Sequence, residues 1–402
     1  MAQVLIVGAG PAGASLAYLL ADRGVEVTLL ERQRDFAREF RGEILQPSGV
    51  DALQQMGLAR PLQAVPQIRP SPLRVYQNQK LVLEMALDPA LFAGQPPVAM
   101  SQPALLEMLV AEASKRPAFH FHRGTVVRDL LWEKERIVGV RAETEQGERR
   151  FHADLVIGAD GRASVVRRHG GFVAEEQAPP MDVVWCKLPC PASFRGARAY
   201  LGRGHLLIAY QTWDDRLQIA WAILKGTFGA LKRHGIEAWV EQMAHHVTPD
   251  LAEALRAHRG AMVHPFLLDV VSDRVQRWSA PGVLLIGDAA HTMSPVGGQG
   301  LNVALRDALV AANHLVPTLL ACPDTQSIDT AARRISSERL PEIFRVQRAQ
   351  AVPPRVLFSR AWWAEPLRSL LAVLVRTPVG RRVAAGPARL FAFGMSPVRL
   401  RV

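Results

Sequence analysis

Six residues near the N-terminus have the types and spacing of a phosphate-binding turn. They follow the pattern G-x-G-x-x-G and are Gly8, Ala9, Gly10, Pro11, Ala12 and Gly13. The first glycine of this pattern permits a tight turn, the second lets backbone approach a pyrophosphate, and the third lets a helix pack close to a sheet. Glu31 follows at a distance where an acid can accept hydrogen bonds from an adenosine ribose. The pattern indicates binding of an adenine dinucleotide, either NAD or FAD.

Two later motifs place an acid and a glycine together directly after a hydrophobic run. Asp160 is followed by Gly161, and Gly287 is followed by Asp288. The second motif continues into a loop with one proline and three glycines, which are Pro295, Gly297, Gly298 and Gly300. An acid after a strand can cap the next helix or bind a ligand, so each motif alone leaves both readings open.

Short aliphatic strands must position these motifs. The expected elements are a strand at 4–7, a helix at 14–23, strands at 25–30, 154–157 and 283–286, and a long helix from Leu301. The order strand, glycines, helix, strand and acid predicts a βαβ unit. The positive end of its helix would favour phosphates. The alternative is a glycine-rich turn in some other βαβ unit.

Together the three motifs resemble those of the class A flavoprotein monooxygenases, the family of para-hydroxybenzoate hydroxylase and the ubiquinone-biosynthesis hydroxylases. The matched stretch runs from residue 1 to about residue 310 and ends in the loop sequence PVGGQGLN. The resemblance implies an α/β fold. A Rossmann-like FAD-binding domain with a parallel sheet would be interleaved with a mixed or antiparallel substrate sheet and followed by C-terminal helices.

The resemblance also implies which residues contact FAD. Asp288 and Gln102 would contact the ribityl chain, Arg41 the region near the phosphates, and Asp160 with Gly161 both FAD and NAD(P)H. The other expected cofactor contacts are Gly8, Gly10, Pro11, Ala12, Gly13, Glu31, Arg32, Gly287, Gly298, Gly300, Leu301 and Asn302. A helix beginning at the last two would stabilise the negative charge of reduced flavin. The alternatives are a turn cap for Asp288 and solvated surface contacts for Arg41 and Gln102.

The resemblance and the strand-like alternation of the middle of the chain predict three regions. The FAD-binding domain comprises 1–71, 96–180 and 271–345, the substrate sheet comprises 72–95 and 181–270, and the basic C-terminal helical region comprises 346–402. Alternation of side chains along 217–224 is typical of a strand.

A hydroxylase of this kind must hold an aromatic ring near the flavin and help its hydroxyl group lose a proton. Tyr210, and less so Tyr200 and His205, are the polar candidates in the sheet, where the alternative is ordinary packing. Pro295 completes the predicted catalytic set, and His291 is expected to be structural. No tyrosine follows Tyr210, so the family's tyrosine relay has no counterpart. The many Leu, Ile, Trp and Ala residues predict an apolar substrate.

The net charge of +11 lies entirely at the C-terminal end. Residues 331–402 contain fourteen arginines, no lysine and three acids, so the rest of the chain is neutral. This distribution argues against a nucleic-acid binder. Leu367, Leu370, Leu371 and Leu374 form a helical stripe followed by arginines. Region 353–402 would then either pack on the FAD domain or lie on an anionic membrane surface.

The sequence therefore predicts an enzyme, a monooxygenase that uses FAD, NADPH or NADH, and O2. It would hydroxylate an apolar, electron-rich aromatic substrate through a flavin C4a-hydroperoxide. Arg32, Arg34 and Arg38 could attract the 2′-phosphate of NADPH. Three cysteines without zinc-ligand spacing predict no metal site and a reduced, cytoplasmic location, with the inner membrane face as a variant. The alternatives are a reductase of a prenyl or polyene lipid and a non-catalytic, membrane-docked flavin protein.

Overall fold

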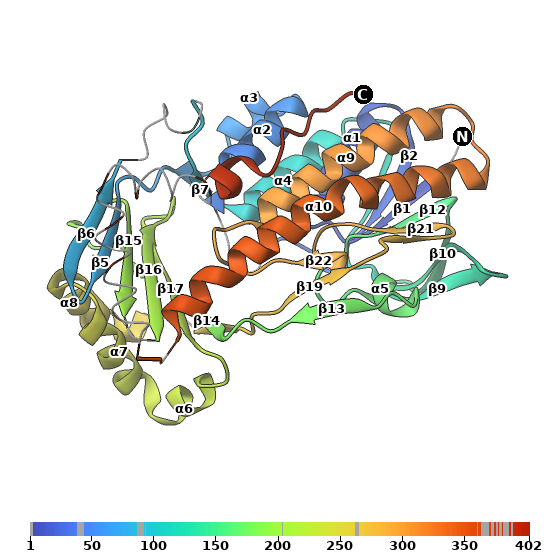
Figure 1. Ribbon diagram of the computed structural model, residues 1–402. Helices are drawn as coiled ribbons and strands as arrows, with labels where there is room; N and C mark the ends of the chain where they lie inside the picture. The colour runs from blue at the N-terminus through green and yellow to red at the C-terminus, as the bar shows by residue number, and fades with distance from the viewer. Residues whose placement is uncertain are drawn as a thin grey trace.

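A six-stranded sheet carries the first glycine motif at its centre (Figure 1). Its order is β20 (Ser279–Ala280), β21 (Val283–Leu285), β12 (Leu155–Gly158), β1 (Gln3–Val7), β2 (Glu26–Leu30) and β8 (Phe119–His122). All neighbours are parallel except β20 and β21. The central strands are aliphatic and almost completely buried, as expected where helices cover a parallel sheet.

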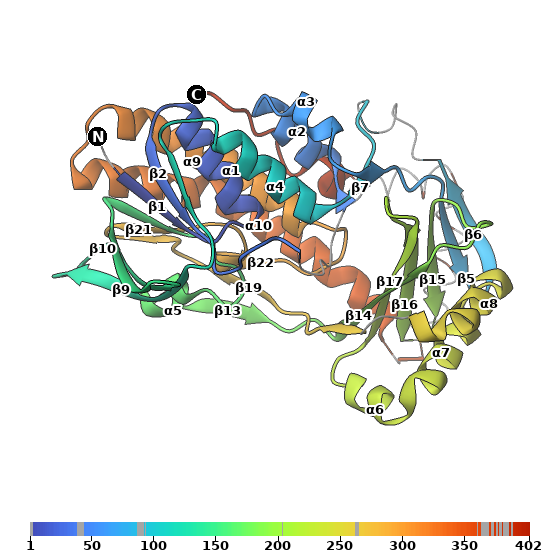
Figure 2. The ribbon, with the colours of Figure 1, turned by 180° about the vertical axis from the view of Figure 1, so that it is seen from behind.

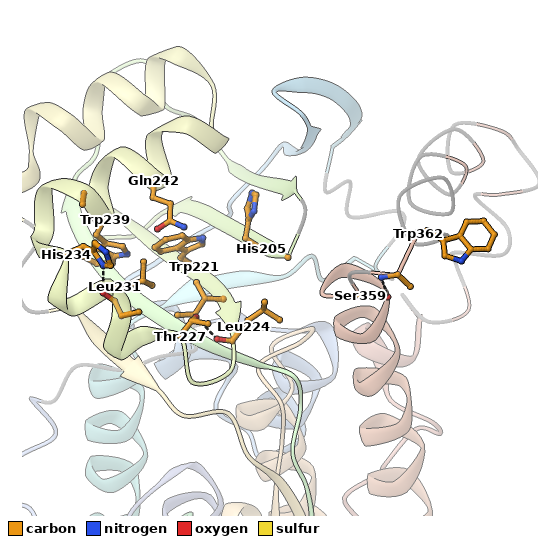
Figure 3. A pocket seen from close by; sticks show the side chains of 15 residues that line it. His205, Trp221, Leu224, Thr227, Leu231, His234, Trp239, Gln242, Ser359 and Trp362 are labelled. Atoms are coloured by element: carbon orange, nitrogen blue, oxygen red, sulfur yellow. Dashed lines mark hydrogen bonds between the residues drawn. The ribbon is translucent and has the colours of Figure 1, made fainter.

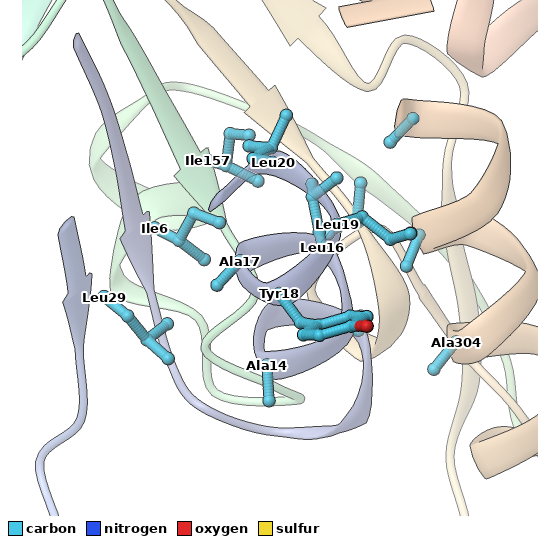
Figure 4. Packing of buried hydrophobic residues seen from close by; sticks show 14 of the residues in the cluster. Ile6, Ala14, Leu16, Ala17, Tyr18, Leu19, Leu20, Leu29, Ile157 and Ala304 are labelled. Atoms are coloured by element: carbon cyan, nitrogen blue, oxygen red, sulfur yellow. The ribbon is translucent and has the colours of Figure 1, made fainter. Parts of the chain in front are cut away.

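Small and aliphatic residues let one helix pack closely on this sheet and let a second helix pack on the first. α1 (Pro11–Asp22) lies between Ile6, Leu29 and Ile157 of the strands and Ala304 of α9 (Gly300–Leu320), as Figure 4 shows. α9 is long and apolar enough to cross a membrane, but 72% of its most apolar segment is buried inside the protein. It therefore has the burial of a core helix. α4 (Gln102–Ala113) packs beside α1.

The computed structural model describes residues 3–402 with gaps. The residues outside the description are 38–43, 87–91, 93, 203, 262–264, 360, 363–369, 371–373, 375–376, 378–379, 381–385 and 387–388. The FAD contact predicted for Arg41 lies outside the described residues, as do Leu367 and Leu371 of the predicted C-terminal leucine stripe.

A seven-stranded sheet forms the other half of the molecule (Figure 2). Its order is β18 (Phe266–Leu268), β14 (Met181–Pro189), β17 (Arg216–Leu224), β16 (His205–Gln211), β15 (Ala197–Gly202), β5 (Leu73–Gln77) and β6 (Lys80–Met85). Neighbours are antiparallel except β15 and β5. Strands from two distant parts of the sequence thus share one sheet.

Helices cover one face of this sheet. They are α6 (Phe228–Arg233), α7 (Gly235–His246) and α8 (Pro249–Ala257), followed by the short η2 (Arg259–Ala261). Trp239 and Met243 of α7 pack on Trp221 and Ile219 of the sheet. Residues 181–270, which were assigned to the substrate sheet from their strand-like segments, thus also contain these helices. Residues 217–224 form a strand, as predicted. Both faces of this strand are buried, so the alternation of its side chains does not separate a buried face from a solvent-exposed one.

Smaller elements complete the fold. The three-stranded sheets are β11 (Gly147–His152), β10 (Arg136–Thr144) and β9 (Val126–Glu133); β13 (Ala174–Gln177), β19 (Ser272–Val275) and β22 (His291–Thr292); and β3 (Ile44–Leu45), β7 (Val98–Met100) and β4 (Gln67–Ile68). The remaining helices are α2 (Pro47–Gln55), α3 (Ala59–Gln63), α5 (Val165–His169), η3 (Gly287–Ala289) and α10 (Thr325–Leu357). The predicted fold class is confirmed, since the sheets are parallel and antiparallel and long helices follow them.

The long helix α10 joins the two halves. It runs beside α9 on the parallel sheet and ends under the antiparallel sheet, where Phe358 packs against Met181 and Leu268 (Figure 1). The domain boundary predicted at 345/346 falls inside this helix, so the backbone has no break there. One continuous helix therefore contacts both sheets.

The last residues return to the FAD-binding half. Arg23 of α1 donates to the carbonyl oxygen of Val402 at 2.7 Å, and the amide of Leu400 donates to Gln55 at 2.8 Å. Residues 398–402 therefore pack on the protein, which is the structural alternative for this end of the basic region. Leu370 and Leu374 are 55% and 41% exposed.

Candidate cofactor and substrate site

The three sequence motifs meet at one edge of the parallel sheet. Val7 of β1 is paired with Gly158 of β12, which is paired with Leu285 of β21. Because these strands are parallel neighbours, the turns that follow them lie side by side at their carboxyl ends. This edge is where open α/β sheets bind ligands.

The first turn has the shape that a pyrophosphate requires. Gly8 has φ +99°, and a Cβ there would lie 2.5 Å from the carbonyl oxygen of Ala159. A Cβ on Gly13 would lie 2.0 Å from the carbonyl oxygen of Gly8. α1 then begins at Pro11, after Gly10, without a side-chain cap on its first amides. The turn thus presents backbone N–H groups and a helix N-terminus, which fits the diphosphate of FAD.

Glu31 lies beside this turn at the end of β2. Its buried carboxylate accepts hydrogen bonds from the amides of Ala9 and Gln33, each at 2.9 Å. Two backbone donors fix the carboxylate, and its remaining lone pairs can accept from a ribose. Arg32 follows it and is exposed.

Asp160 caps the helix that follows its motif. Its Oδ1 accepts from Ser164 Oγ at 2.5 Å, and its Oδ2 accepts from the amide of Val165 at 2.6 Å. Burial raises the pKa of this carboxyl group above its ordinary value, while these hydrogen bonds oppose the rise. Gly161 has open space around it, so the backbone there can be approached by a ligand.

The capped turn places a cation next to the third motif. Arg162 Nε lies 3.4 Å from Asp288 Oδ2, and the Asp288 side chain is 34% exposed. The carboxylate predicted to bind the ribityl chain therefore faces solvent and Arg162. The adjoining amide of Gly287 donates inward to Asp307 Oδ2 at 3.1 Å.

A buried cluster of charged side chains contacts the Gly287 turn from the interior of the protein. Asp307 Oδ2 also lies 2.7 Å from His291 Nε2, and Arg339 Nε donates to Asp307 Oδ1 at 2.7 Å. Arg339 and Arg306 both pair with Glu342. Burial would raise the pKa of Asp307, but attraction to His291 and Arg339 outweighs it, so this pKa is lowered.

Of this cluster, only His291 was predicted from the sequence, with a structural role. The signal for the others is the charged pair at 306 and 307 inside the apolar run LNVALRDALVAA. Two ionised residues in an otherwise buried helical stretch need partners, because burying an unpaired charge is expensive. A second helix with compensating charges at 339 and 342 supplies them.

Amide side chains hold the glycine loop, and that of Asn302 links it to the segment before α2. Asn302 Oδ1 accepts from the amide of Gln46 at 2.8 Å, and Asn302 Nδ2 donates to the carbonyl oxygen of Gly298 at 2.7 Å. The carbonyl oxygen of Pro295 accepts from the amide of Gly298 at 3.0 Å, so this proline shapes the turn. Gly300 has open space around it and begins α9, followed by Leu301.

One face of the antiparallel sheet meets this loop. Trp185, Ile208 and Tyr210 lie on this face, where Tyr210 packs among them and Ile44. Val296 of the glycine loop packs against the same face. A Cβ on Gly298 would lie 3.5 Å from Ile44 Cβ. An apolar, aromatic surface with one phenol therefore stands opposite the loop, and we name it the loop-facing surface.

His205 and Tyr200 are not brought to that surface. His205 shares the helix-covered face with Leu207, and its ring lies 3.6 Å from that of His246 on α7. Tyr200 donates or accepts at Thr248 Oγ1 at 2.8 Å on the same covered face. Of the predicted catalytic residues, His205 and Tyr210 therefore lie on opposite faces of the sheet, because a β-strand points alternate residues to opposite faces.

Gln102 occupies the first position of α4, where it is buried behind the Ser101 cap. Within the residues that the structure covers, no group of three or more His, Cys, Asp or Glu side chains could hold a metal ion. The groups gathered at the sheet edge are instead backbone amides, a helix N-terminus, and the carboxylates of Glu31, Asp160 and Asp288.

A Rossmann-type turn, a Gly-Asp motif and a covered second sheet define a two-domain flavoprotein. A family model described as an FAD-binding domain matches residues 1–339. The chain belongs to this family and binds FAD. It is an FAD-dependent monooxygenase of the aromatic-hydroxylase type, as the sequence resemblance predicted.

One curated relative matches nearly the whole chain. The 6-methylpretetramide 4-monooxygenase of Streptomyces rimosus is 33% identical over 406 residues, covering 99% of this chain and 94% of the relative. Two solved structures share the fold. PqsL of Pseudomonas aeruginosa, in complex with 2-aminobenzoylacetate, has a TM-score of 0.77 at 23% identity, over 91% of this chain and 99% of its own. The p-nitrophenol 4-monooxygenase PnpA of Pseudomonas putida has a TM-score of 0.79 at 17% identity, over 99% and 100%.

Proposed function

We propose that this enzyme takes electrons from NADPH or NADH and places one oxygen atom of O2 on an electron-rich, apolar aromatic ring. The observation that carries the proposal is the loop-facing surface, which sets Trp185 and Tyr210 opposite the Pro295–Gly300 loop. Bound FAD would supply electron transfer and oxygen activation, as cofactors do in such enzymes.

The chain's own residues would then bind FAD, orient the substrate and exclude water from both. The amides after Gly8 and the N-terminus of α1 would hold the diphosphate, and Glu31 the ribose. Asp288 would accept from the ribityl chain. Trp185 and Ile208 would pack against an aromatic ring held between them and the loop. They would also exclude water, which protects oxygen transfer from side reactions.

Tyr210 is the proposed proton-transfer group for the substrate hydroxyl. It is buried among Ile44, Leu73 and Trp185. A phenol in such a place can accept a hydrogen bond from, or donate one to, the ring oxygen that must be activated. Deprotonating that oxygen would make the aromatic ring more electron-rich before oxygen reaches it.

The test uses purified enzyme with FAD, NADPH or NADH, and 6-methylpretetramide, the compound in the name of the Streptomyces relative. With 18O2, mass spectrometry should find one labelled oxygen atom in the product and one nicotinamide oxidised per product. A product with altered hydrogen content but no label would favour the alternative of a prenyl or polyene reductase. Simple phenols and naphthols serve as a second substrate panel, and no labelled product from any of them would contradict the proposal.

NADPH differs from NADH by a 2′-phosphate, and exposed arginines beside Glu31 could bind it. Arg32 is exposed beside Glu31, and Arg34 pairs with Glu145 at 3.0 Å. A 2′-phosphate would find positive charge there. We therefore propose a preference for NADPH, measured as the ratio of kcat/KM for the two nucleotides.

We also propose a peripheral membrane contact for the basic region, with the enzyme on the cytoplasmic side. Trp362, Leu370 and Leu374 are exposed, and arginines at 376, 381, 382 and 389 accompany them in the sequence. Apolar and basic groups together suit an anionic lipid surface, where an apolar substrate also dissolves.

A further inference from the structure

A cavity lies on the helix-covered face of the antiparallel sheet, on the side opposite the loop-facing surface. Its volume is about 880 Å³, within the range of small-molecule sites. Trp221 of β17 and Trp239 of α7 line it, with His234 and Gln242 beside them. Ser359 and Trp362, after the end of α10, line the other side, as Figure 3 shows.

The two indoles have the burial of core residues but leave polar groups without partners. Trp221 and Trp239 are 2% and 5% exposed, and their ring centroids lie 6.2 Å apart at an interplanar angle of 29°. Neither Nε1–H group has a hydrogen-bond acceptor among the residues described by the structure. Buried donors in native proteins are almost always satisfied, so two adjacent exceptions in the wall of one cavity need an explanation.

The rim of the cavity is polar, unlike its floor. His234 and Gln242 are exposed on the helical side. The His234 ring is oriented by a contact of 2.6 Å between its Nδ1 and the carbonyl oxygen of Ala230. Stacked indoles favour a flat aromatic ring, and two N–H groups favour a ligand with oxygen acceptors.

We propose that this cavity binds a flat aromatic molecule that carries carbonyl or hydroxyl oxygens, at a site separate from the one where the reaction occurs. The sheet itself separates the two, since Trp221 lies on the face covered by α7 and Trp185 on the face toward the loop. The inference does not depend on the reaction proposed above. It would hold equally for a reductase or a non-catalytic flavin protein.

The test measures binding of 1,2-dihydroxyanthraquinone to the FAD-loaded full chain by equilibrium dialysis, which does not depend on tryptophan fluorescence. Trp239→Phe keeps an aromatic ring and removes one donor, and should weaken binding about three- to tenfold, the range for one lost hydrogen bond. Ala238→Trp fills the cavity from an exposed position of α7 and should weaken binding at least tenfold. Trp185→Phe, the matched change on the other face, should leave this site's affinity unchanged.

Each variant is first checked for FAD absorbance and melting temperature. Should Trp239→Phe fold poorly, Ala238→Trp decides alone, because its side chain points from the surface of α7. The proposal is overturned if the wild type shows no saturable binding, which would mean that water alone satisfies the indoles. It is also overturned if all variants bind equally, or if only Trp185→Phe loses binding, which would place the probe on the loop-facing surface.

Discussion

Asp307 and His291 form a buried pair that joins the core helix α9 to the Gly-Asp turn. Their Oδ2 and Nε2 atoms are 2.7 Å apart, and the same oxygen accepts from the amide of Gly287. One carboxylate therefore fixes both ends of the segment that carries Asp288. The turn is positioned by charges beneath it, which leaves the Asp288 side chain available at the surface of the sheet edge.

Replacing Asp307 should loosen this turn. Asp307→Asn removes one of the two carboxylate partners of the buried Arg339 guanidinium, which keeps Glu342, and breaking a buried ion pair typically costs about 3–5 kcal/mol. We expect a lower free energy of unfolding and a weaker affinity for FAD, measured by urea unfolding and by FAD titration of the apoprotein. Glu338→Gln, at an exposed pair on α10, is the control and should cost about 1 kcal/mol or less. Unchanged FAD affinity in Asp307→Asn would show that the turn does not need this support.

The same cluster predicts acid sensitivity. Burial would raise the pKa of Glu342, but attraction to Arg339 and Arg306 outweighs it, so the pKa of Glu342 and that of Asp307 lie below the ordinary values of 4.5 and 3.8. Their stabilisation is complete above those ordinary values and is lost as the pH falls through the lowered ones. Below pH 4.5 the unfolded chain binds more protons, so the free energy of unfolding should fall with decreasing pH.

Urea unfolding of the wild type and Glu342→Gln between pH 3 and 6 tests this. The variant should lose up to about 1.4 kcal/mol per pH unit of the slope, the value for one carboxyl group. Glu338→Gln measures how much comes from removing one negative charge on α10. Parallel curves for the wild type and Glu342→Gln would rule out the assignment.

The parallel sheet and its three turns could be predicted from the sequence, because each depends on a local pattern of residues. Gly8 and Gly13 have no tolerance for a side chain, and that requirement is visible as glycine in the sequence. The charged cluster was not predicted, since Asp307 and Glu342 come together only when α9 packs on α10. The two residues are far apart in sequence, and no spacing rule links them.

The substrate side shows the same limit. Tyr210, and less so His205, were the polar candidates predicted in this part of the sheet, and both lie in one strand. Their faces differ because an odd number of positions separates them along β16, and which face meets the loop is decided by helices α7 and α8. Those helices were missed because apolar residues such as Trp239 and Met243 fit a sheet core and a helix stripe alike.

A methyl group in the first turn should abolish cofactor binding. Gly13→Ala would place Cβ 2.0 Å from the carbonyl oxygen of Gly8, which lies in backbone and cannot move without opening the turn. We expect this variant to purify without flavin absorbance. Gly229→Ala in α6 has no close neighbour and is the matched control; it should retain FAD and melt no lower than the wild type. Full FAD occupancy in Gly13→Ala would contradict the proposed diphosphate site.

Replacing Tyr210 and Tyr200 in turn should distinguish a loss of catalysis from a loss of stability. If Tyr210 transfers the substrate proton, Tyr210→Phe should lower kcat for labelled-oxygen incorporation by about a hundredfold, while FAD affinity stays the same. Tyr200→Phe loses the 2.8 Å contact with Thr248 on the covered face and should cost about 1 kcal/mol of stability with little change in kcat. Equal rates for the wild type and Tyr210→Phe would move proton transfer to another group.

The basic region can be tested without removing any packed segment. A truncation at 353 would cut α10 and remove the contacts of residues 398–402, so poor binding by that fragment would mean nothing. Replacing Arg376, Arg381 and Arg382 with Gln removes three positive charges and leaves the chain at full length. With about 1 kcal/mol for each arginine near an anionic surface, the triple variant should partition roughly a hundredfold less onto phosphatidylglycerol vesicles in a flotation assay.

The matched control for that assay replaces Arg128, Arg149 and Arg150, three arginines of the β9–β11 sheet, with Gln. It makes the same change in net charge, so it should bind vesicles as the wild type does if contact is local to the C-terminal region. A loss equal to that of the tail variant would mean that overall charge drives binding. Absence of wild-type flotation at low salt, where such attraction is strongest, would overturn the proposed membrane contact.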